Sequence, residues 1–143
     1  MIIKQISIFV ENKKGRMAEI AKIIGDAGID IRALSVADTA DFGILRLIVD
    51  KPEQAVLTLK EAGMTVSLTD VLAVALADEP GAFAAAMGVI SDCGVNIEYM
   101  YAFISRCEGE AYVIVRTEDP AASAELLAGK GLRLLSSGEI YNL

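Results

Sequence analysis

The sequence contains no histidine and no tryptophan, and only two cysteines and three prolines among its 143 residues. Without histidine the chain lacks the commonest general base and the commonest zinc ligand. Serine or cysteine triads and histidine-containing metal sites are therefore excluded. Cys93 and Cys107 form no C-x-x-C pair, so we interpret them as buried or idle thiols in a reducing compartment. Nothing in the sequence predicts a cofactor or a bound metal.

Basic residues are also scarce, with 13 Lys and Arg against 20 Asp and Glu, which gives a net charge of −7. Binding to phosphate backbones requires clustered cations, so we expect neither nucleic acid nor an anionic membrane as a partner. No apolar run approaches the ~20 residues that span a bilayer, and residues 1–10 lack the features of a signal peptide. We therefore expect a cytoplasmic protein. Its 54% of hydrophobic residues exclude disorder and favour self-association.

The two halves of the chain repeat each other. Three residues of the first half recur 68 positions later, two more than the offset of 66 found nearer the start of each copy. The second half therefore carries two extra residues, which fall near 106–110. The repeat predicts two modules of the same fold, residues 1–70 and residues 71–143, with no linker between them. Six further residues recur at an offset of 66, where Gly15, Ala18, Ile24, Asp26, Gly28 and Ile31 match Gly81, Ala84, Ile90, Asp92, Gly94 and Ile97.

Each copy shows the same succession of strand and helix patterns. Residues 6, 8 and 10 alternate as in a strand, and 71–77 is the matching stretch. A loop ending in glycine precedes a helix that Gly28 or Gly94 ends, and Pro52 and Pro120 begin the second helices. The expected helix faces are Met17, Ile20, Ala21, Ile24 and Ala27 in the first copy and Phe83, Ala86, Met87, Ile90 and Cys93 in the second.

The remaining strands complete a βαββαβ order in both copies. Second strands are expected at about 29–37 and 95–104, third strands at 43–49 and 111–116, and turns at 38–41 and 106–109. A fourth strand closes each copy, at 64–69 in the first. The fold class is therefore α+β, with two tandem ferredoxin-like modules whose antiparallel sheets carry helices on one face.

The ferredoxin-like plan hosts RNA binders, metal carriers, enzymes and ligand sensors, so the fold alone identifies no function. RNA binders need aromatic residues on the third strand and a basic face, whereas 43–49 reads Gly-Ile-Leu-Arg-Leu-Ile-Val and 111–116 reads Ala-Tyr-Val-Ile-Val-Arg. Metal carriers of this plan need C-x-x-C, which the sequence does not contain. What stands out is the loop at 77–83, reading Ala-Asp-Glu-Pro-Gly-Ala-Phe, and the turn Gly94-Val95-Asn96-Ile97.

At these two motifs the sequence resembles the ACT domain family, whose signature joins an Asp-x-Pro-Gly-x-Leu-like loop to a Gly-x-Asn-Ile turn. In the first copy the loop 12–17 keeps the glycine but lacks the proline, and Asp30 replaces the asparagine. The resemblance implies a free amino acid bound where the loop of one module meets the turn of another. The ligand-binding residues would be Asn12, Lys14, Gly15, Arg16, Met17, Asp30, Ile31, Asp78, Glu79, Pro80, Gly81, Ala82, Phe83, Asn96 and Ile97.

An amino acid suits such a loop chemically. Unpaired amides at a helix N-terminus, approached through glycine, can hold an α-carboxylate. The side chains of Asn12, Asp30, Asp78 or Asn96 can accept hydrogen bonds from the α-ammonium group. The alternative is structural, because Asn12 or Asp78 would also serve as a helix cap and Pro80 as a first-turn residue. The matched loops and turns favour the ligand.

The sequence thus predicts a non-catalytic regulatory protein, at least a homodimer, that signals to a partner such as a metabolic enzyme. Tyr99, Tyr101 and Phe103 alternate on one strand face, which we assign to core or subunit interface rather than to a pocket. Apolar lining favours branched-chain or aromatic amino acids. The alternatives are an accessory subunit with a vestigial pocket, and an enzyme using Tyr99, Tyr101 or Arg32.

Overall fold

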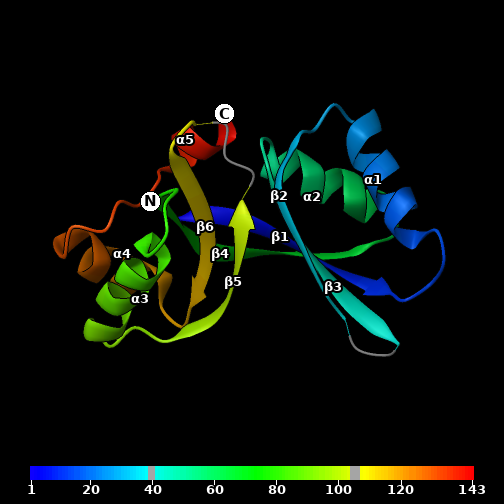
Figure 1. Cartoon of the computed structure of the whole chain (residues 1–143). Coiled ribbons are helices and arrows are strands. Elements are labelled where there is room, and N and C mark those ends of the chain that lie inside the picture. Colours follow the sequence, from blue (N-terminus) through cyan, green and yellow to red (C-terminus); the bar gives the residue numbers. More distant parts are fainter. Residues whose placement is uncertain (39–40, 104–106) are drawn as a thin grey trace. The chain divides into compact units, whose positions relative to one another are not determined.

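The computed structural model describes residues 1–38, 41–103 and 107–143 (Figure 1). The expected turns at 38–41 and 106–109 and the end of the strand expected at 95–104 extend outside these described residues. By contacts the chain divides into two compact units. The first module consists of Lys4–Thr69 with Asn142, and the second of Asp70–Tyr141 with Met1–Ile3 and Leu143. Within the described ranges, no helix is long and apolar enough to cross a membrane.

In the first module, two helices lie on one side of an antiparallel sheet (Figure 1). The strands follow the order β2-β3-β1-β4, with Ile8 opposite Leu45 and Val36 also opposite Leu45. The elements are β1 (Ile3–Glu11), α1 (Arg16–Asp26), β2 (Ile31–Asp38), β3 (Phe42–Val49), α2 (Pro52–Glu61) and β4 (Thr65–Ala77). The strands expected at 64–69 and 71–77 are thus a single strand, β4, shared by the two modules.

The second module repeats this plan, with strand order β4-β6-β5. Its further elements are α3 (Ala82–Asp92), β5 (Ile97–Phe103), β6 (Glu110–Thr117), α4 (Pro120–Gly129) and α5 (Ser137–Tyr141). The fold class predicted from the sequence, an α+β pair of ferredoxin-like modules, is confirmed.

The fourth strand expected in the second module is reduced to a single bridge between Leu134 and Val74. The chain turns instead into α5, which the sequence analysis missed. The Ser136 amide donates to Glu139 Oε2 (2.7 Å), and the Glu139 amide donates to Ser136 Oγ (3.2 Å). This reciprocal pair is a capping box, and its Ser-x-x-Glu spacing is a local signal that starts a helix before a strand can extend.

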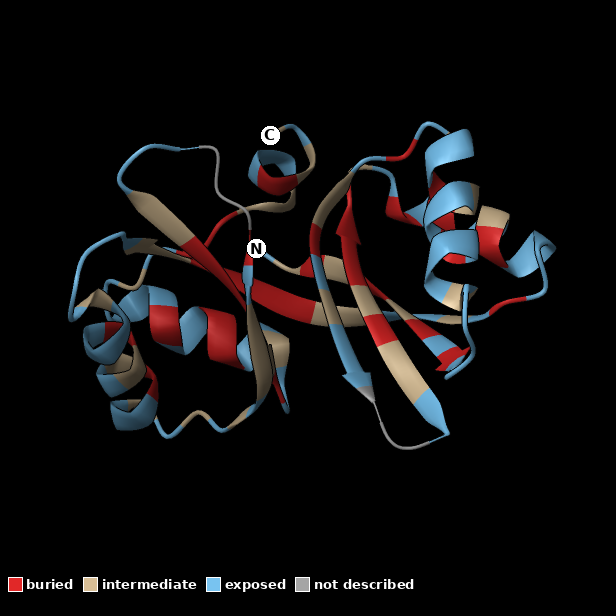
Figure 2. Ribbon diagram, turned by 45° about the vertical axis from the view of Figure 1, so that its right-hand side comes forward, coloured by how far each residue is buried: buried red, intermediate tan, exposed pale blue. Residues whose placement is uncertain are grey.

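Each module has its own core of buried residues from helices and sheet, and Figure 2 colours the buried positions red in both modules. Ile20 and Ile24 of α1 correspond to Ala86 and Ile90 of α3, and all four are buried. The expected faces are wrong at three other positions, because Met17, Ala21 and Phe83 are exposed. Met17 and Phe83 lie in the first helical turn beside the loops, and Ile23 packs against the core in place of Ala21.

The ends of α1 and α3 confirm the helix stops predicted at Gly28 and Gly94. Ile29 N donates to Ile24 O (3.2 Å) and Gly28 N to Gly25 O (3.0 Å), the paired bonds of a Schellman motif. The same pair of bonds closes α2, α3 and α4 ahead of Met64, Val95 and Leu132. Pro52 and Pro120 are the first residues of α2 and α4, as expected.

The start of α4 gives a first prediction. Asp119 caps the helix, because its Oδ1 accepts a hydrogen bond from Ala122 N at 3.1 Å. Asp119→Ala should lower the free energy of unfolding by about 1 kcal/mol, whereas Asp119→Asn, which keeps an acceptor, should lower it much less. Urea denaturation of the three proteins measures this. An equal loss in both variants would show that the charge, rather than the cap, stabilises this helix.

Candidate functional site

The loop before α1 and the loop before α3 have the same backbone hydrogen bonds, although only the second contains proline. The Asn12 amide donates to Asp41 O (3.0 Å), and the Asp78 amide donates to Gly109 O (2.9 Å). Two further bonds recur in both loops: Lys13 N to Glu11 O and Arg16 N to Lys13 O in the first, Glu79 N to Ala77 O and Ala82 N to Glu79 O in the second. Proline is therefore not required for this loop conformation.

Glycine is the residue that both loops share at the start of the helix. Gly15 (φ 84°) and Gly81 (φ 90°) are the N-caps of α1 and α3, in the left-handed conformation that side chains with a β-carbon disfavour. Among the described residues no side chain caps either helix. The structural alternative for Asn12, Asp78 and Pro80 is therefore wrong: none of them is a cap or a first-turn residue. The amides of Met17 and Ala18 in α1, and of Phe83 and Ala84 in α3, have no backbone acceptor among the described residues.

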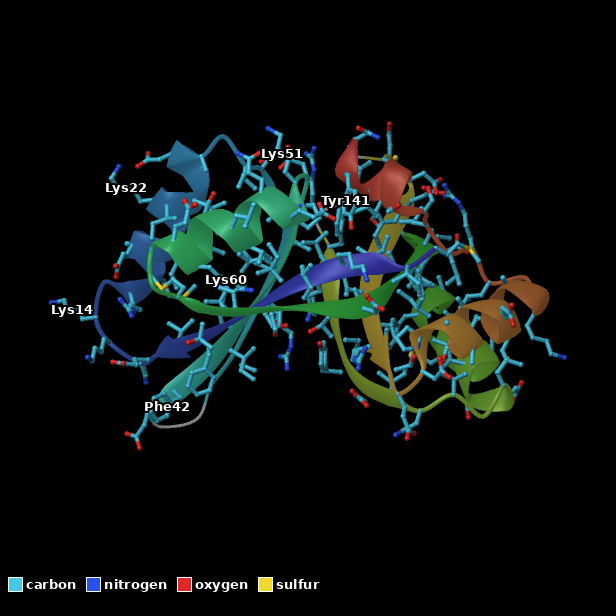
Figure 3. The ribbon with its side chains drawn as sticks, turned by 180° about the vertical axis from the view of Figure 1, so that it is seen from behind. Lys14, Lys22, Phe42, Lys51, Lys60 and Tyr141 are labelled. Carbon is cyan, nitrogen blue, oxygen red and sulfur yellow. The ribbon has the colours of Figure 1, made fainter. Side chains whose placement is uncertain are left out.

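A small pocket opens beneath the first of these loops, with a volume of about 100 Å³. We call it the loop pocket. Three predicted residues, Asn12, Arg16 and Met17, line it. Lys14 and Gly15 lie in the same loop but are not among the lining residues; Figure 3 shows Lys14 at the loop's outer side. The other lining residues were not predicted from the sequence; they are Val10, Glu11, Lys13, Val36, Gly43 and Leu45.

The missed apolar residues come from three neighbouring strands. Val36 lies opposite Leu45 in the pairing of β2 with β3, and Val10 lies opposite Gly43 in the pairing of β1 with β3. Val10 and Leu45 belong to the core cluster, so this side of the sheet faces the helices. Alternation along each strand indicates the face, but only strand pairing shows that these residues meet at the loop.

Positive charge distinguishes the first loop from the second. Lys13 Nζ lies 2.6 Å from Glu11 Oε2, and its hydrogen bond and charge lower the pKa of that exposed carboxyl. Arg16 Nη1 contacts Glu19 Oε2 at 2.9 Å, while its buried Nε has no hydrogen-bond partner among the described residues. The second loop, 77–83, holds two acids and no cation. A carboxylate is therefore favoured at the first loop.

The turn residues predicted from the signature lie at the opposite ends of the helices from the loops. Helices α1 and α3 each have 11 residues, a length of about 16 Å. The structure therefore does not bring the loop and the turn of one module together. Asp30 is engaged by Arg32 Nη1 at 2.6 Å, and its amide donates to Asp50 Oδ1 at 2.9 Å.

The remaining predicted residues fall into two groups. Ile31 and Ile97 pack against the two cores, and Asn96 lines another pocket of the second module. In the second loop Ala82 is half-buried, and the residues exposed to solvent are Asp78, Glu79, Pro80, Gly81 and Phe83.

The aromatic stripe of β5 ends in a buried ring, and the acidic residues form no metal site in the described ranges. The pairing of β5 with β6 places Tyr99, Tyr101 and Phe103 on one face, as predicted. Phe103 is buried, and its ring contacts that of Tyr112 with centroids 5.7 Å apart, so it belongs to the core. Within the described ranges, no three Cys, Asp or Glu residues are grouped so as to hold a metal.

Comparison with known proteins places this geometry in a family. The model of the ACT domain pair matches residues 1–143. Protein BT0572 from Bacteroides thetaiotaomicron, known from its crystal structure, is 40% identical, with a TM-score of 0.93 over 100% of this chain and 98% of that one. A search of curated proteins gives no match.

More distant structures share the fold. The ligand-free regulatory subunit of aspartate kinase from Thermus thermophilus is 19% identical, with a TM-score of 0.64 over 88% of this chain and 91% of that one. The corresponding subunit from Thermus flavus is 17% identical, with a TM-score of 0.60 over 88% and 90%. Together with the match over the whole length, the loops and the fold show that this chain belongs to the ACT domain pair family.

Proposed function

We propose that this chain is a non-catalytic regulatory protein that binds a free amino acid in the loop pocket. The observation that carries the proposal is the uncapped start of α1 beside a partly buried arginine. The amides of Met17 and Ala18 and Arg16 Nε would bind the α-carboxylate, because these donors have no hydrogen-bond partner among the described residues. Asn12 and Glu11, at the rim, would accept from the α-ammonium group.

The apolar wall of the loop pocket supports a ligand with an apolar side chain. Val10, Met17, Val36 and Leu45 offer no polar side-chain partner, which favours a branched-chain or aromatic amino acid over a polar one. This preference for an apolar side chain rests only on the residues that line the loop pocket. The pocket's volume of about 100 Å³ is also well below that of a fully enclosing ligand site, about 300 Å³ or more.

The small size of the loop pocket supports assembly of this chain into a homodimer. Because the loop and the turn of one module lie at opposite ends of a helix, a ligand that touched both kinds of motif would need a second module. We propose that a second copy of the chain supplies it, so that the protein is at least a homodimer. The ligand would then favour the assembled state by its differential affinity. Output would pass to a separate enzyme, as the regulatory subunits of aspartate kinase with this fold suggest.

One observation favours a different function for the second module. The loop of the second module carries Asp78 and Glu79 where the first carries Asn12 and Lys13, and these acids repel a carboxylate. The second module would then hold a partner without binding an amino acid itself. We therefore assign amino-acid binding to the first loop, and a cytoplasmic setting suits free amino acids.

A thermal-shift screen against the twenty amino acids tests the proposal, because a ligand that binds only the folded state raises the unfolding midpoint. We expect a saturable rise with one chemical class. Arg16→Gln should weaken that ligand by roughly tenfold or more, since it removes a charge-assisted hydrogen bond. Lys60→Gln, an exposed cation on α2, is the control. A flat screen would contradict amino-acid sensing and leave the accessory-subunit alternative.

A further inference from the structure

A second pocket, of about 200 Å³, lies in the second module between the end of α3 and the start of α4. We call it the turn pocket. The lining residues used below are Gly94, Asn96, Thr117, Glu118, Asp119 and Ala122. It is separated from the loop before α3 by the length of that helix.

The equivalent place in the first module is closed by side chains. Lys51 Nζ donates to Gly28 O (3.1 Å), and Gln54 Nε2 donates to Ala27 O (3.2 Å). The Asp50 amide donates to Asp30 O (3.1 Å), and Asp50 Oδ1 accepts from Asp30 N (2.9 Å). Four hydrogen bonds thus tie the end of α1 to the start of α2.

The second module has different residues at the positions that make these bonds. At the offset of 68, Asp119 replaces Lys51 and Ala122 replaces Gln54. None of the four bonds has a counterpart among the described residues of this turn. The charge is also reversed, because an ammonium group is exchanged for a carboxylate. Gly94 O corresponds to Gly28 O, which accepts a hydrogen bond from the Lys51 ammonium in the first module. In the second module Asp119 stands at that lysine's position and has no ammonium to donate to this carbonyl.

The floor of the turn pocket carries an added hydroxyl. Thr117 replaces Val49, and both residues are almost fully buried, Thr117 with only 1% of its surface exposed. Its side chain lies on the helix-facing side of the sheet, as that of Val115 does two residues earlier. Thr117 Oγ1 has no hydrogen-bond partner among the described residues. A buried hydroxyl without a partner is costly, and packing does not require it, since valine fills the same position in the first module.

We propose that the turn pocket binds the primary ammonium group of a small molecule. The ammonium would take the place that Lys51 Nζ has in the first module and donate to Gly94 O and Thr117 Oγ1. The carboxylates of Glu118 and Asp119 would supply the compensating charge. Neither carboxylate has an ion-pair partner among the described residues. The site differs in charge from the loop pocket and does not depend on the function proposed for it.

Titration with n-propylammonium chloride at constant ionic strength, followed by amide NMR shifts, tests this site. We expect saturable shifts confined to residues around Asn96, Thr117 and Ala122. Glu118→Gln with Asp119→Asn, which preserves shape and the helix cap, should weaken binding by roughly tenfold or more. Ala122→Gln should restore the closure that Gln54 makes and abolish the shifts. Glu125→Gln, an exposed acid on the same helix, is the matched control and should change nothing.

Two results would overturn the inference. One is that sodium chloride or tetramethylammonium chloride, which has no N–H donor, produces the same shifts as the amine. The other is unchanged affinity in the double variant. The two proposals fail separately: Arg16→Gln should remove the amino-acid response without affecting the amine shifts. A protein that responds to an amino acid but not to the amine contradicts only the turn pocket, and the reverse result contradicts only the proposed function.

Discussion

Valine in place of Gly15 is expected to abolish the amino-acid response while the chain still folds. Gly15 has a φ of 84°, and a β-carbon added there would meet no atom within 4 Å. The cost is therefore backbone strain rather than a clash. Holding valine in the left-handed conformation costs about 1 to 2 kcal/mol. Relief of that strain moves the first-turn amides of α1, which the proposed site uses for the carboxylate.

Two variants separate this effect from general destabilisation. Gly25 lies in the last turn of α1, where an added β-carbon would also meet no atom within 4 Å, so Gly25→Ala should stabilise the helix by up to about 0.5 to 1 kcal/mol with binding intact. Gly81→Val introduces the same strain in the second loop and should leave the response in place. Calorimetric titration with the amino acid found in the screen measures all three. Binding retained by Gly15→Val, or lost with Gly81→Val alone, would refute the assignment to the first loop.

Leu127→Ala should lower the free energy of unfolding by about 2 to 5 kcal/mol, the largest loss of stability expected here. Leu127 has no exposed surface and lies in the core of the second module. Its counterpart in the first module, Leu59, is equally buried. Truncation removes packed methyl groups and leaves a cavity that the rigid sheet and helices cannot close.

The neighbouring leucine provides a control on the same helix. Leu126 is 52% exposed, so Leu126→Ala should change the free energy of unfolding by only a few tenths of a kcal/mol. Urea denaturation at one temperature, with the slope compared between variants, measures both. A loss of similar size in the two variants would mean that α4 packs with a different face toward the sheet than the structure shows.

Comparison of the two modules shows how the same backbone supports different chemistry. The loops share their hydrogen bonds and their glycines, yet Arg16 stands where the second loop has Ala82. Conversely, Lys51 closes a turn in the first module that Asp119 leaves open in the second. Each module is thus expected to bind a different charged group, a carboxylate in the first and an ammonium in the second.

The sequence by itself determined the features that depend on neighbouring residues along the chain. The repeat predicted two modules, and the glycines at 28 and 94 and the prolines at 52 and 120 predicted where helices end and begin. These predictions are confirmed because caps, stops and strand alternation are settled by hydrogen bonds and side-chain directions within a few residues. The same local logic, in the Ser-x-x-Glu box at Ser136, could have predicted α5.

Only the tertiary structure decided which residues meet. Val36 and Leu45 reach the loop pocket through the pairing of two strands, and no spacing along the chain indicates that they face Arg16. Strand pairing also left the second module with a bridge instead of a fourth strand. The turn pocket exists because side chains from the start of α4 fail to reach the carbonyls at the end of α3. Such contacts join segments far apart in the chain, so they are set by packing rather than by local sequence.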